Sequence, residues 1–358
     1  MMIHAVSARD VPVADGFAPD VLRAPPYLLA AGKERLQGDR SASDRTEHDA
    51  RFMAIPQGKI VVTDREVFYL DADDRFFDAY YPKPWVYEAR RGSDGALSLP
   101  ADTQGLQRRA GAVFAPFLVA GNWFHTLVDN LARMYFYEQL GAPALPVIVP
   151  SWAAGAAGSD RAAVNALFLA GKPVQVLAPG IYQFDTVILP PLGNKDDYIY
   201  RAPLDFVART LLARLRKTPP AHPLRLFISR ADIDVRNLDN EAELIAALRP
   251  LGVTPICPGD FSFWTQLELF STAELIIGVH GQGFTPMICA RACRRVMEFE
   301  AADWHFTAYR SIASCYDIPY EKMPCTLVEH RNPRRFDWLA HADIPATVDR
   351  VAQAVAAL

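Results

Sequence analysis

A glycine-bearing corner is the first stretch of this 358-residue chain whose residue types suit chemistry. GVHGQGFTPM, residues 278–287, follows the apolar run AELII and places His280, Gly281 and Gly283 together. Glycine lets the backbone approach a ligand closely, and a following helix offers unpaired N–H groups and a positive dipole end. We therefore expect an anion here, above all a diphosphate. The alternative is a tight structural turn in which a backbone carbonyl satisfies His280.

Two arginines follow an expected strand further upstream. In ISRADIDVRNLDNEAEL, residues 228–244, Arg230 stands at the strand end and Arg236 lies in the loop after it. A guanidinium group grips phosphate oxygens in a bidentate manner, so both arginines suit the same anion. In the alternative, a solvated loop, they pair with the neighbouring acids Asp232, Asp234 and Asp239.

A polar stripe runs along the expected helix NWFHTLVDNLARMYF, residues 122–136. His125, Asp129 and Arg133 are spaced by four and share this stripe. Because the stripe begins beside the strand VFAPFLV, His125 or Asp129 is a candidate general base. The alternative is an Asp129–Arg133 surface pair, worth about a few tenths of a kcal/mol.

Alternating strands and helices must position these stretches. Residues 52–90 predict short strands of a meander, and residues 112–189 predict a parallel α/β sheet. Residues 225–299 predict four strands with three intervening helices, a doubly wound unit of Rossmann type. Ligands of such folds bind beyond the carboxyl ends of the strands, where all three stretches fall.

The domain organisation follows from breaks in this rhythm. The prolines of residues 219–223 interrupt any helix and predict a hinge. We expect an N-terminal domain over 1–218, β-rich at first and then α/β, and a Rossmann-like domain over 219–328. Residues 329–358 form a tail that ends in an amphipathic docking helix. The charged residues 32–51 predict an exposed loop.

Composition excludes several classes of protein. The net charge of −4 and the pI of 6.1 give no basic field, so nucleic acid is not an expected partner. The five cysteines lack zinc spacing and indicate reduced thiols in a cytosolic protein.

No run approaches the roughly 18 apolar residues of a membrane span. We expect a soluble cytoplasmic protein, with peripheral contact to the inner membrane left open. GxGxxG and GxSxG motifs are absent from the sequence.

Together these stretches resemble glycosyltransferase family 61, whose bacterial members are often described as capsular polysaccharide biosynthesis proteins. The motifs occur in the family's order: FHTLVDNLAR, ISRADIDVRNLDNEAEL, FSFWTQLELFSTAELIIGVHGQGFTPM and VMEFE. The resemblance covers roughly residues 112–325. Its most specific positions are Arg230, Arg236, Asn240, Glu241, Phe263, Gln266, Phe270, Ala273, Gly278, His280, Gly281 and Gly283.

The resemblance implies a GT-B architecture, with two Rossmann-type domains facing across a cleft. It implies an inverting, metal-independent glycosyltransferase without a cofactor. The donor is a nucleotide sugar, most commonly a UDP-sugar, and the acceptor is a hydroxyl of a polysaccharide or glycolipid precursor. The alternative is a non-catalytic relative of the same fold that binds a nucleotide or a carbohydrate.

The resemblance also assigns roles to residues. Glu298 accepts hydrogen bonds from ribose hydroxyls, with a polar residue at a sheet edge as the alternative. Asp129 and His125 are the catalytic candidates, and Asn122 and Arg133 lie on the acceptor side. Arg230, Arg236, His280, Gly281, Gln282, Gly283, Phe284, Thr285 and Glu298 are the donor-binding set.

Two positions depart from the family pattern. The family commonly shows Gly-Leu-Thr-Asn after the glycine turn, whereas this chain has Pro286 in the place of the asparagine. Proline is acceptable in a first helical turn, so the helix start survives. Thr126 replaces an aromatic residue often seen after the histidine, which affects the acceptor pocket.

Overall fold

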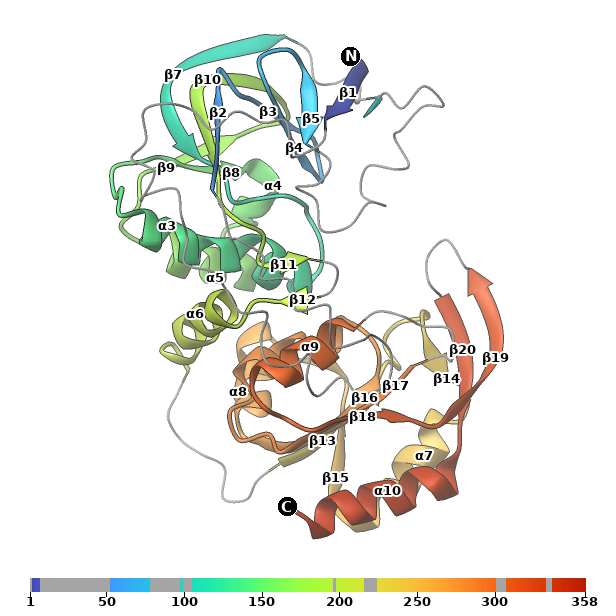
Figure 1. The fold of residues 1–358 in the computed structure, drawn as a ribbon. Helices are drawn as coiled ribbons and strands as arrows, with labels where there is room; N and C mark the ends of the chain where they lie inside the picture. The colour runs from blue at the N-terminus through green and yellow to red at the C-terminus, as the bar shows by residue number, and fades with distance from the viewer. Residues whose placement is uncertain are drawn as a thin grey trace, which may run out of the picture. The chain divides into compact units, whose positions relative to one another are not determined.

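The chain forms two compact units in the computed structural model (Figure 1). The described residues up to Thr210 form unit 1, and those from Leu211 to Leu358 form unit 2. The predicted hinge at 219–223, the predicted loop at 32–51 and part of the predicted meander, 78–90, lie outside the described residues. The structure describes residues 2–6, 52–77, 97–98, 105–195, 198–215, 224–300, 307–332 and 337–358.

Unit 1 is built on a mixed sheet, in which ten strands of the described residues take part. Along the sheet the order is β6-β1-β5-β4-β3-β10-β7-β8-β9, and β2 also pairs with β10. The predicted parallel part is confirmed, because β10 with β7, β7 with β8, and β8 with β9 run parallel. The predicted meander is confirmed for β3, β4 and β5, which are antiparallel. The bounds are β1 Met2–Val6, β2 Met53–Pro56, β3 Lys59–Val62, β4 Val67–Leu70, β5 Arg75–Phe77, β6 Leu97–Ser98, β7 Leu106–Phe114, β8 Val147–Pro150, β9 Val174–Leu177 and β10 Gly180–Leu189.

Helices complete unit 1. Helix α5 (Asp160–Leu169) starts at Ser159, whose side chain accepts a hydrogen bond from the Ala162 backbone N–H as an N-cap. Strands β3 and β4 are buried along their whole length, and all their residues except Lys59, which pairs with Asp74, are apolar and lie in the core. The other elements are α4 (Ser151–Ala154), β11 (Asn194–Lys195), β12 (Tyr198–Ile199) and α6 (Arg201–Leu212).

The predicted helix over residues 122–136 is confirmed as a helical stretch, but it is not one regular α-helix. A π-helix, η4 (His125–Asn130), is followed by a 3₁₀ turn, η5 (Leu131–Arg133), and only then by the α-helix α3 (Met134–Leu140). Asn130 explains the irregularity, because its side chain bonds to the backbone of residues 118–119 at 2.8 and 2.9 Å. Bonds to distant backbone thus override the regular helical pattern, and π-turns are common at functional sites.

Unit 2 contains a five-stranded parallel sheet of order β15-β13-β16-β17-β18. The four predicted strands are confirmed as β13 (Leu224–Ile228), β15 (Val253–Ile256), β16 (Ala273–Val279) and β17 (Arg295–Phe299). Helix α9 (Ala308–Cys315) and strand β18 (Tyr320–Met323) extend this unit beyond the prediction. Helices α7 (Glu241–Leu248) and α8 (Phe263–Ser271) match predicted ones; α7 is extended by η6 (Arg249–Leu251), and η7 (Pro258–Asp260) precedes α8.

The helix after the glycine turn differs from the prediction. Segment η8 (Gln282–Cys289) is a 3₁₀ helix, and Pro286 lies inside it, not in its first turn. Proline lacks the N–H that a regular α-helix needs at an interior position, which fits the tighter, irregular geometry.

The order of the strands creates a switch point in the sheet. Strand β13 lies between β15 and β16, so that Ile228 pairs with Ile256 on one side and with Gly278 on the other. The chain leaves β13 toward one side and later returns on the other. Ligands of open α/β sheets bind outside the carboxyl ends of the strands at such a point.

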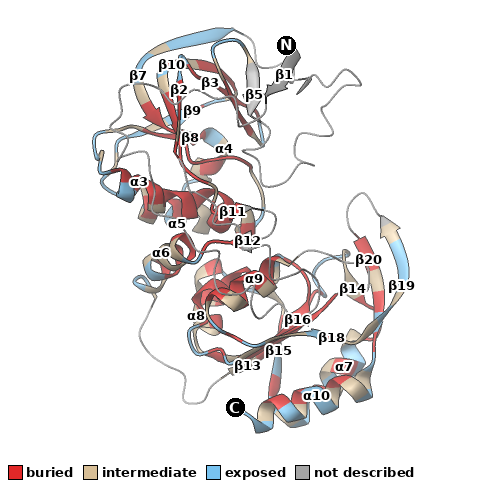
Figure 2. Cartoon of the chain, viewed as in Figure 1, coloured by how far each residue is buried: buried red, intermediate tan, exposed pale blue. Residues whose placement is uncertain are grey.

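A small second sheet and the C-terminal helix complete unit 2. The strands are β14 (Asn237–Leu238), β20 (Asp337–Ala342) and β19 (Cys325–Asn332), in this order. The predicted docking helix is α10 (Ile344–Ala356), which buries Val351 and Ala354 in the same core as Leu244 and Leu248 of α7. Figure 2 shows buried and exposed residues alternating along α10, as an amphipathic helix requires.

Across the described residues, no helix has the length and apolar character needed to cross a membrane.

Candidate active site

Gly281 brings the glycine corner against an arginine. A Cβ atom at this position would overlap the Nη1 atom of Arg230. The backbone of Gly281 is extended, with φ 162°, so space and not conformation demands glycine here. At Gly283 an added Cβ would come within 2.9 Å of Ile228 and 3.1 Å of Pro258. The carboxyl ends of β13 and β16 are therefore in direct contact at the switch point.

Arg230 is buried, and Arg236 is half-buried. Arg230 is 4% exposed and donates through Nε and Nη2 to the Val235 carbonyl at 2.9 and 2.7 Å. Burial, with the charge of Arg236, lowers the pKa of Arg230 to about 10. Burial also lowers the pKa of Arg236, whose φ of 57° is left-handed. A bound anion stabilises cations in this situation, since it offsets both desolvation and repulsion.

Two of the acids that offered an alternative to anion binding have other partners. Asp234 pairs with Arg331 at 3.3 Å, and Asp239 pairs with His341 at 2.7 Å. Asp232 lies near enough to Arg230 to favour its charge, but burial outweighs this effect on the pKa.

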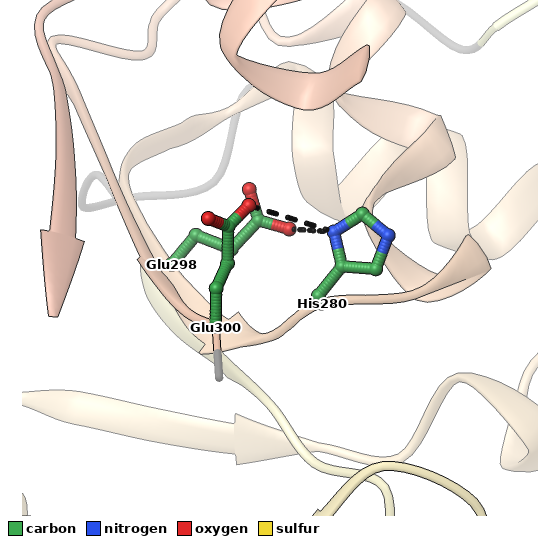
Figure 3. Close-up of side chains that lie close together, drawn as sticks. All are labelled: His280, Glu298 and Glu300. Atoms are coloured by element: carbon green, nitrogen blue, oxygen red, sulfur yellow. Dashed lines mark hydrogen bonds and ion pairs between the residues drawn. The ribbon is translucent and has the colours of Figure 1, made fainter. Parts of the chain in front are cut away.

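The Nδ1 atom of His280 contacts two carboxylates. It lies 2.7 Å from Oε1 of Glu298 and 3.8 Å from Oε1 of Glu300 (Figure 3). The Tyr320 hydroxyl lies 2.8 Å from Oε2 of Glu298 and 3.2 Å from Oε1 of Glu300. Lys322 approaches Glu300 at 3.5 Å. These five residues, His280, Glu298, Glu300, Tyr320 and Lys322, are called the His280 cluster below.

Burial makes the two glutamates unusually basic. It raises the pKa of Glu298 to about 8 and that of Glu300 to about 7. Tyr320 and Lys322 oppose the rise by favouring the ionised carboxylates. Glu298 is 1% exposed and both its oxygens are bonded inside the protein, whereas the sequence-based prediction placed ribose hydroxyls there.

Glu300 and Tyr320 were not among the residues predicted for the site. The alternation Glu298-Phe299-Glu300 is a signal for the first, because residues two apart along a strand share a face. Tyr320 belongs to the unpredicted strand β18 and joins the cluster only through strand pairing.

Of the groups in the described chain, His280, Glu298 and Glu300 are the ones whose types and spacing suit a metal ion. One ligand atom from each lies within 4.8 Å of the others. Nitrogen and carboxylate oxygen ligands are those that zinc accepts. However, Lys322 and the Tyr320 hydroxyl already occupy the carboxylates, and the charge of Arg236 acts on Glu298. This surrounding positive charge opposes a cation.

Two of the other residues predicted to bind the donor, Phe284 and Thr285, pack behind the glycine corner in the protein interior. Phe284 and Thr285 are fully buried, and both contact Tyr309, the ring of which lies 5.3 Å from that of His280. Gln282 is exposed at the start of η8. The side chains of Phe284 and Thr285 thus position the corner from behind.

In unit 1 the structure joins His125 and Asp129. Nδ1 of His125 lies 2.6 Å from Oδ2 of Asp129, and Asn194 donates to Oδ1 of the same carboxylate at 3.2 Å. The Asp129 side chain is 0% exposed and that of His125 is 15% exposed. His125 is therefore the member of the pair that reaches the surface. Asp129 orients it, in the manner of a carboxylate behind a catalytic imidazole.

The segment before the π-helix holds His125 in place. A Cβ atom on Gly121 would come within 2.8 Å of the His125 ring, so the backbone packs directly on the imidazole. Arg161 donates to the Gly121 carbonyl at 2.9 Å and to the Thr126 hydroxyl, and lies 5.2 Å from the Trp123 ring centroid.

Two predicted acceptor-side residues have different surroundings. Asn122 is exposed and caps the turn, accepting a hydrogen bond from the His125 backbone N–H at 3.2 Å. Arg133 is 0% exposed and donates to the carbonyls of Pro116, Pro190 and Pro191. The predicted Asp129–Arg133 surface pair is wrong, and Arg133 stabilises the core of unit 1.

Unit 2 is a Rossmann-type α/β unit with a glycine turn and a buried arginine at its switch point. Residues 123–297 match the family model described as Glycosyltransferase 61. Over that segment the chain is similar to this family, as the sequence motifs predicted, and the match supports glycosyltransferase activity. The segment contains the π-helix, both arginines and the glycine corner.

Other comparisons add little. No curated protein matches the chain. Among solved structures, it is similar to the dodecameric iron-containing heptosyltransferase TibC in complex with ADP-D-β-D-heptose. The identity is 14% over 70% of this chain and 77% of that chain, and the TM-score is 0.32. Nothing about this chain follows from a likeness at that level.

Proposed function

We propose that this glycosyltransferase is inverting and metal-independent, and moves a sugar from a nucleoside diphosphate to a hydroxyl of a polysaccharide or glycolipid precursor. In this proposal unit 2 binds the donor and unit 1 supplies the base. UDP is the nucleotide that the family resemblance implies. No separate cofactor takes part.

The contact of Arg230 with Gly281 is the observation that carries the donor site. It joins a buried guanidinium to a glycine turn at the switch point of a parallel sheet. Arg236, whose charge acts on Arg230, lies at the same corner. Two cations near a leaving diphosphate stabilise the negative charge that develops as the sugar departs. They would perform the task that a divalent metal performs in other transferases.

For the base we propose His125, with Asp129 as the residue that orients it. The sequence left both open, but Asp129 is buried and bonded on both oxygens. His125 takes the proton of the acceptor hydroxyl through Nε2 while that oxygen attacks the sugar opposite the nucleotide. The Asp129 carboxylate stabilises the imidazolium that forms.

Calorimetric titration with UDP, GDP and CDP, with and without EDTA, tests the donor site. We expect one diphosphate to bind with an affinity that the chelator leaves unchanged. If none of the three binds, the donor assignment fails. If EDTA abolishes binding, the metal-independent mechanism fails.

Release of nucleoside diphosphate from a panel of nucleotide sugars tests catalysis. We expect slow release with water as acceptor and faster release with a glycan acceptor. Tight nucleotide binding without release from any sugar would favour a non-catalytic binding protein of the same fold.

A further inference from the structure

The His280 cluster lies at the same corner as the arginines but has a different electrostatic character. The two carboxylates come from the end of β17, and the hydroxyl and the ammonium group come from β18. Arg230 and Arg236 lie on the β13 side of His280, and the Tyr309 ring packs against it. A role for His280 must take all these charges into account.

The hydrogen bond between His280 and Glu298 determines which ring nitrogen carries a proton. Consider the pair with one additional proton, counted from a neutral imidazole and an ionised carboxylate. This additional proton has two possible positions. The proton lies either on Glu298, which then donates to Nδ1, or on Nδ1, which then donates to Glu298. In both arrangements Nε2 carries a hydrogen. This second nitrogen points away from both carboxylates (Figure 3).

The surroundings favour the state with the additional proton. Burial raises the pKa values of Glu298 and Glu300 to about 8 and about 7, so the buried carboxylates together retain protons at neutral pH. With this proton the His280–Glu298 pair has no net charge. The neutral pair therefore does not repel a diphosphate, even though the Glu298 carboxyl group is bonded to Nδ1 of His280.

We propose that Glu298 is a positioning residue that keeps a hydrogen on Nε2 of His280, and that His280 is the acid for the leaving diphosphate. This inference rests on the proposed function. As the bond between the sugar carbon and the diphosphate oxygen breaks, the electron pair stays on that oxygen. The Nε2 proton moves to a β-phosphate oxygen, and the shared proton ends on Nδ1. Neutral His280 and ionised Glu298 remain, and a proton from water restores the pair after the nucleotide leaves.

Replacing Glu298 by Gln distinguishes a role of Glu298 in proton transfer from a role in UDP binding. An amide N–H still donates to Nδ1 and leaves the hydrogen on Nε2, but an amide has no proton to pass on. We expect kcat for nucleotide release to fall about tenfold to a hundredfold, in the lower range of general acid effects, with UDP affinity within about threefold of the wild type. His280→Gln should lower both quantities.

The pH profile gives a second readout. In the wild type, kcat falls at alkaline pH as the pair loses its additional proton. In Glu298→Gln the imidazole holds that proton alone, and the fall moves toward the ordinary histidine pKa of about 6.5. Glu321→Gln is the matched control: Glu321 lies between Tyr320 and Lys322 on β18 and pairs with Arg295 and Arg350. An unchanged profile in Glu298→Gln, or equal losses of kcat and affinity with a lowered Tm, overturns the proposal.

Nitrogen-15 NMR of the His280 ring tests the proton directly, with the signal assigned by its loss in His280→Gln. We expect Nε2 to be protonated from pH 6 to pH 8 in the wild type, and an unprotonated Nε2 overturns the proposal. This experiment needs no substrate, so it succeeds or fails independently of the proposed function. If EDTA abolishes nucleotide release, and Mg²⁺, Mn²⁺ or Zn²⁺ restores it in the wild type but not in Glu300→Gln, the cluster is a metal site and the proposal is wrong.

Discussion

At the scale of single residues, two of the histidine–carboxylate pairs in the described part of the chain lie at the proposed sites. His125 with Asp129 and His280 with Glu298 have N–O distances of 2.6 and 2.7 Å. Their settings differ, because His125 reaches the surface of unit 1 while His280 lies beside two cations of unit 2. We assign the first pair to removing a proton and the second to supplying one.

Asp129→Asn tests the first pair. The amide keeps the shape of the side chain but does not stabilise an imidazolium, so kcat should fall about a hundredfold or more, with donor affinity unchanged. His125→Gln should show a similar loss, because the two residues act as a unit. Kinetics of sugar transfer and titration with UDP check both statements. Wild-type turnover in Asp129→Asn would remove this pair from the mechanism.

Arg230→Gln tests the anion site. Loss of a charge-assisted hydrogen bond costs about 1.5 to 3 kcal/mol, so the Kd for UDP should rise about tenfold to a hundredfold. Arg225→Gln is the control, because Arg225 lies at the other end of β13 and pairs with Glu274 at 2.8 Å. A Kd that changes equally in both variants would place the diphosphate elsewhere.

At the scale of elements, the parallel strands of unit 2 were predictable, and the irregular helices were not. Strands such as β16 are continuous apolar runs bounded by turn residues, a pattern that buried parallel strands require. Strand β18, Tyr-Glu-Lys-Met, has no such run and was missed. The π-helix depends on Asn130 bonding to the backbone of residues 118–119, a tertiary contact that helical periodicity does not reveal.

In the candidate site, too, the residues that form local sequence patterns were predictable, and those that depend on tertiary contacts were not. The sequence indicated Arg230 and the glycine corner because a strand end followed by such residue types is a local pattern. It misplaced Arg133 of unit 1, because only the folded structure shows the three carbonyl partners of this side chain. It missed Glu300 and Tyr320 because their contact runs across two strands.

Gly281→Ala tests how closely the ends of β13 and β16 fit together. The added methyl group must displace the Arg230 guanidinium, since the two would overlap. We expect weaker UDP binding, about tenfold or more if the guanidinium contact is lost, with little change in Tm because the Gly281 backbone is extended and any residue adopts it. Thermal unfolding and titration with UDP distinguish this result from a general loss of folding. Wild-type affinity would show that Arg230 is not needed in its present position.

At the scale of the whole molecule, the buried acids couple stability to pH. The folded pKa of Glu298, about 8, lies above the ordinary glutamate value of about 4.3. Between these values the folded state holds protons that the unfolded state has released. The contribution is fully present below about pH 4.3 and is lost as the pH rises through 8.

Urea unfolding from pH 5 to pH 8 measures this coupling. The free energy of unfolding of unit 2 should fall by about a few kcal/mol over the range, because each pKa unit corresponds to about 1.4 kcal/mol. Glu298→Gln should flatten the slope, since its side chain does not titrate. A wild-type slope in that variant would assign the effect to other groups.

The position of Cys257 makes the corner accessible to thiol chemistry. Cys289, Cys293 and Cys315 are buried, while Cys257 and Cys325 are partly exposed. Cys257 precedes Pro258, which an added Cβ on Gly283 would contact at 3.1 Å. Burial raises the pKa of the Cys257 thiol, so a maleimide should modify it slowly. If UDP slows the modification of Cys257 but not that of Cys325, the rate of Cys257 modification measures nucleotide binding at the glycine corner in the native chain.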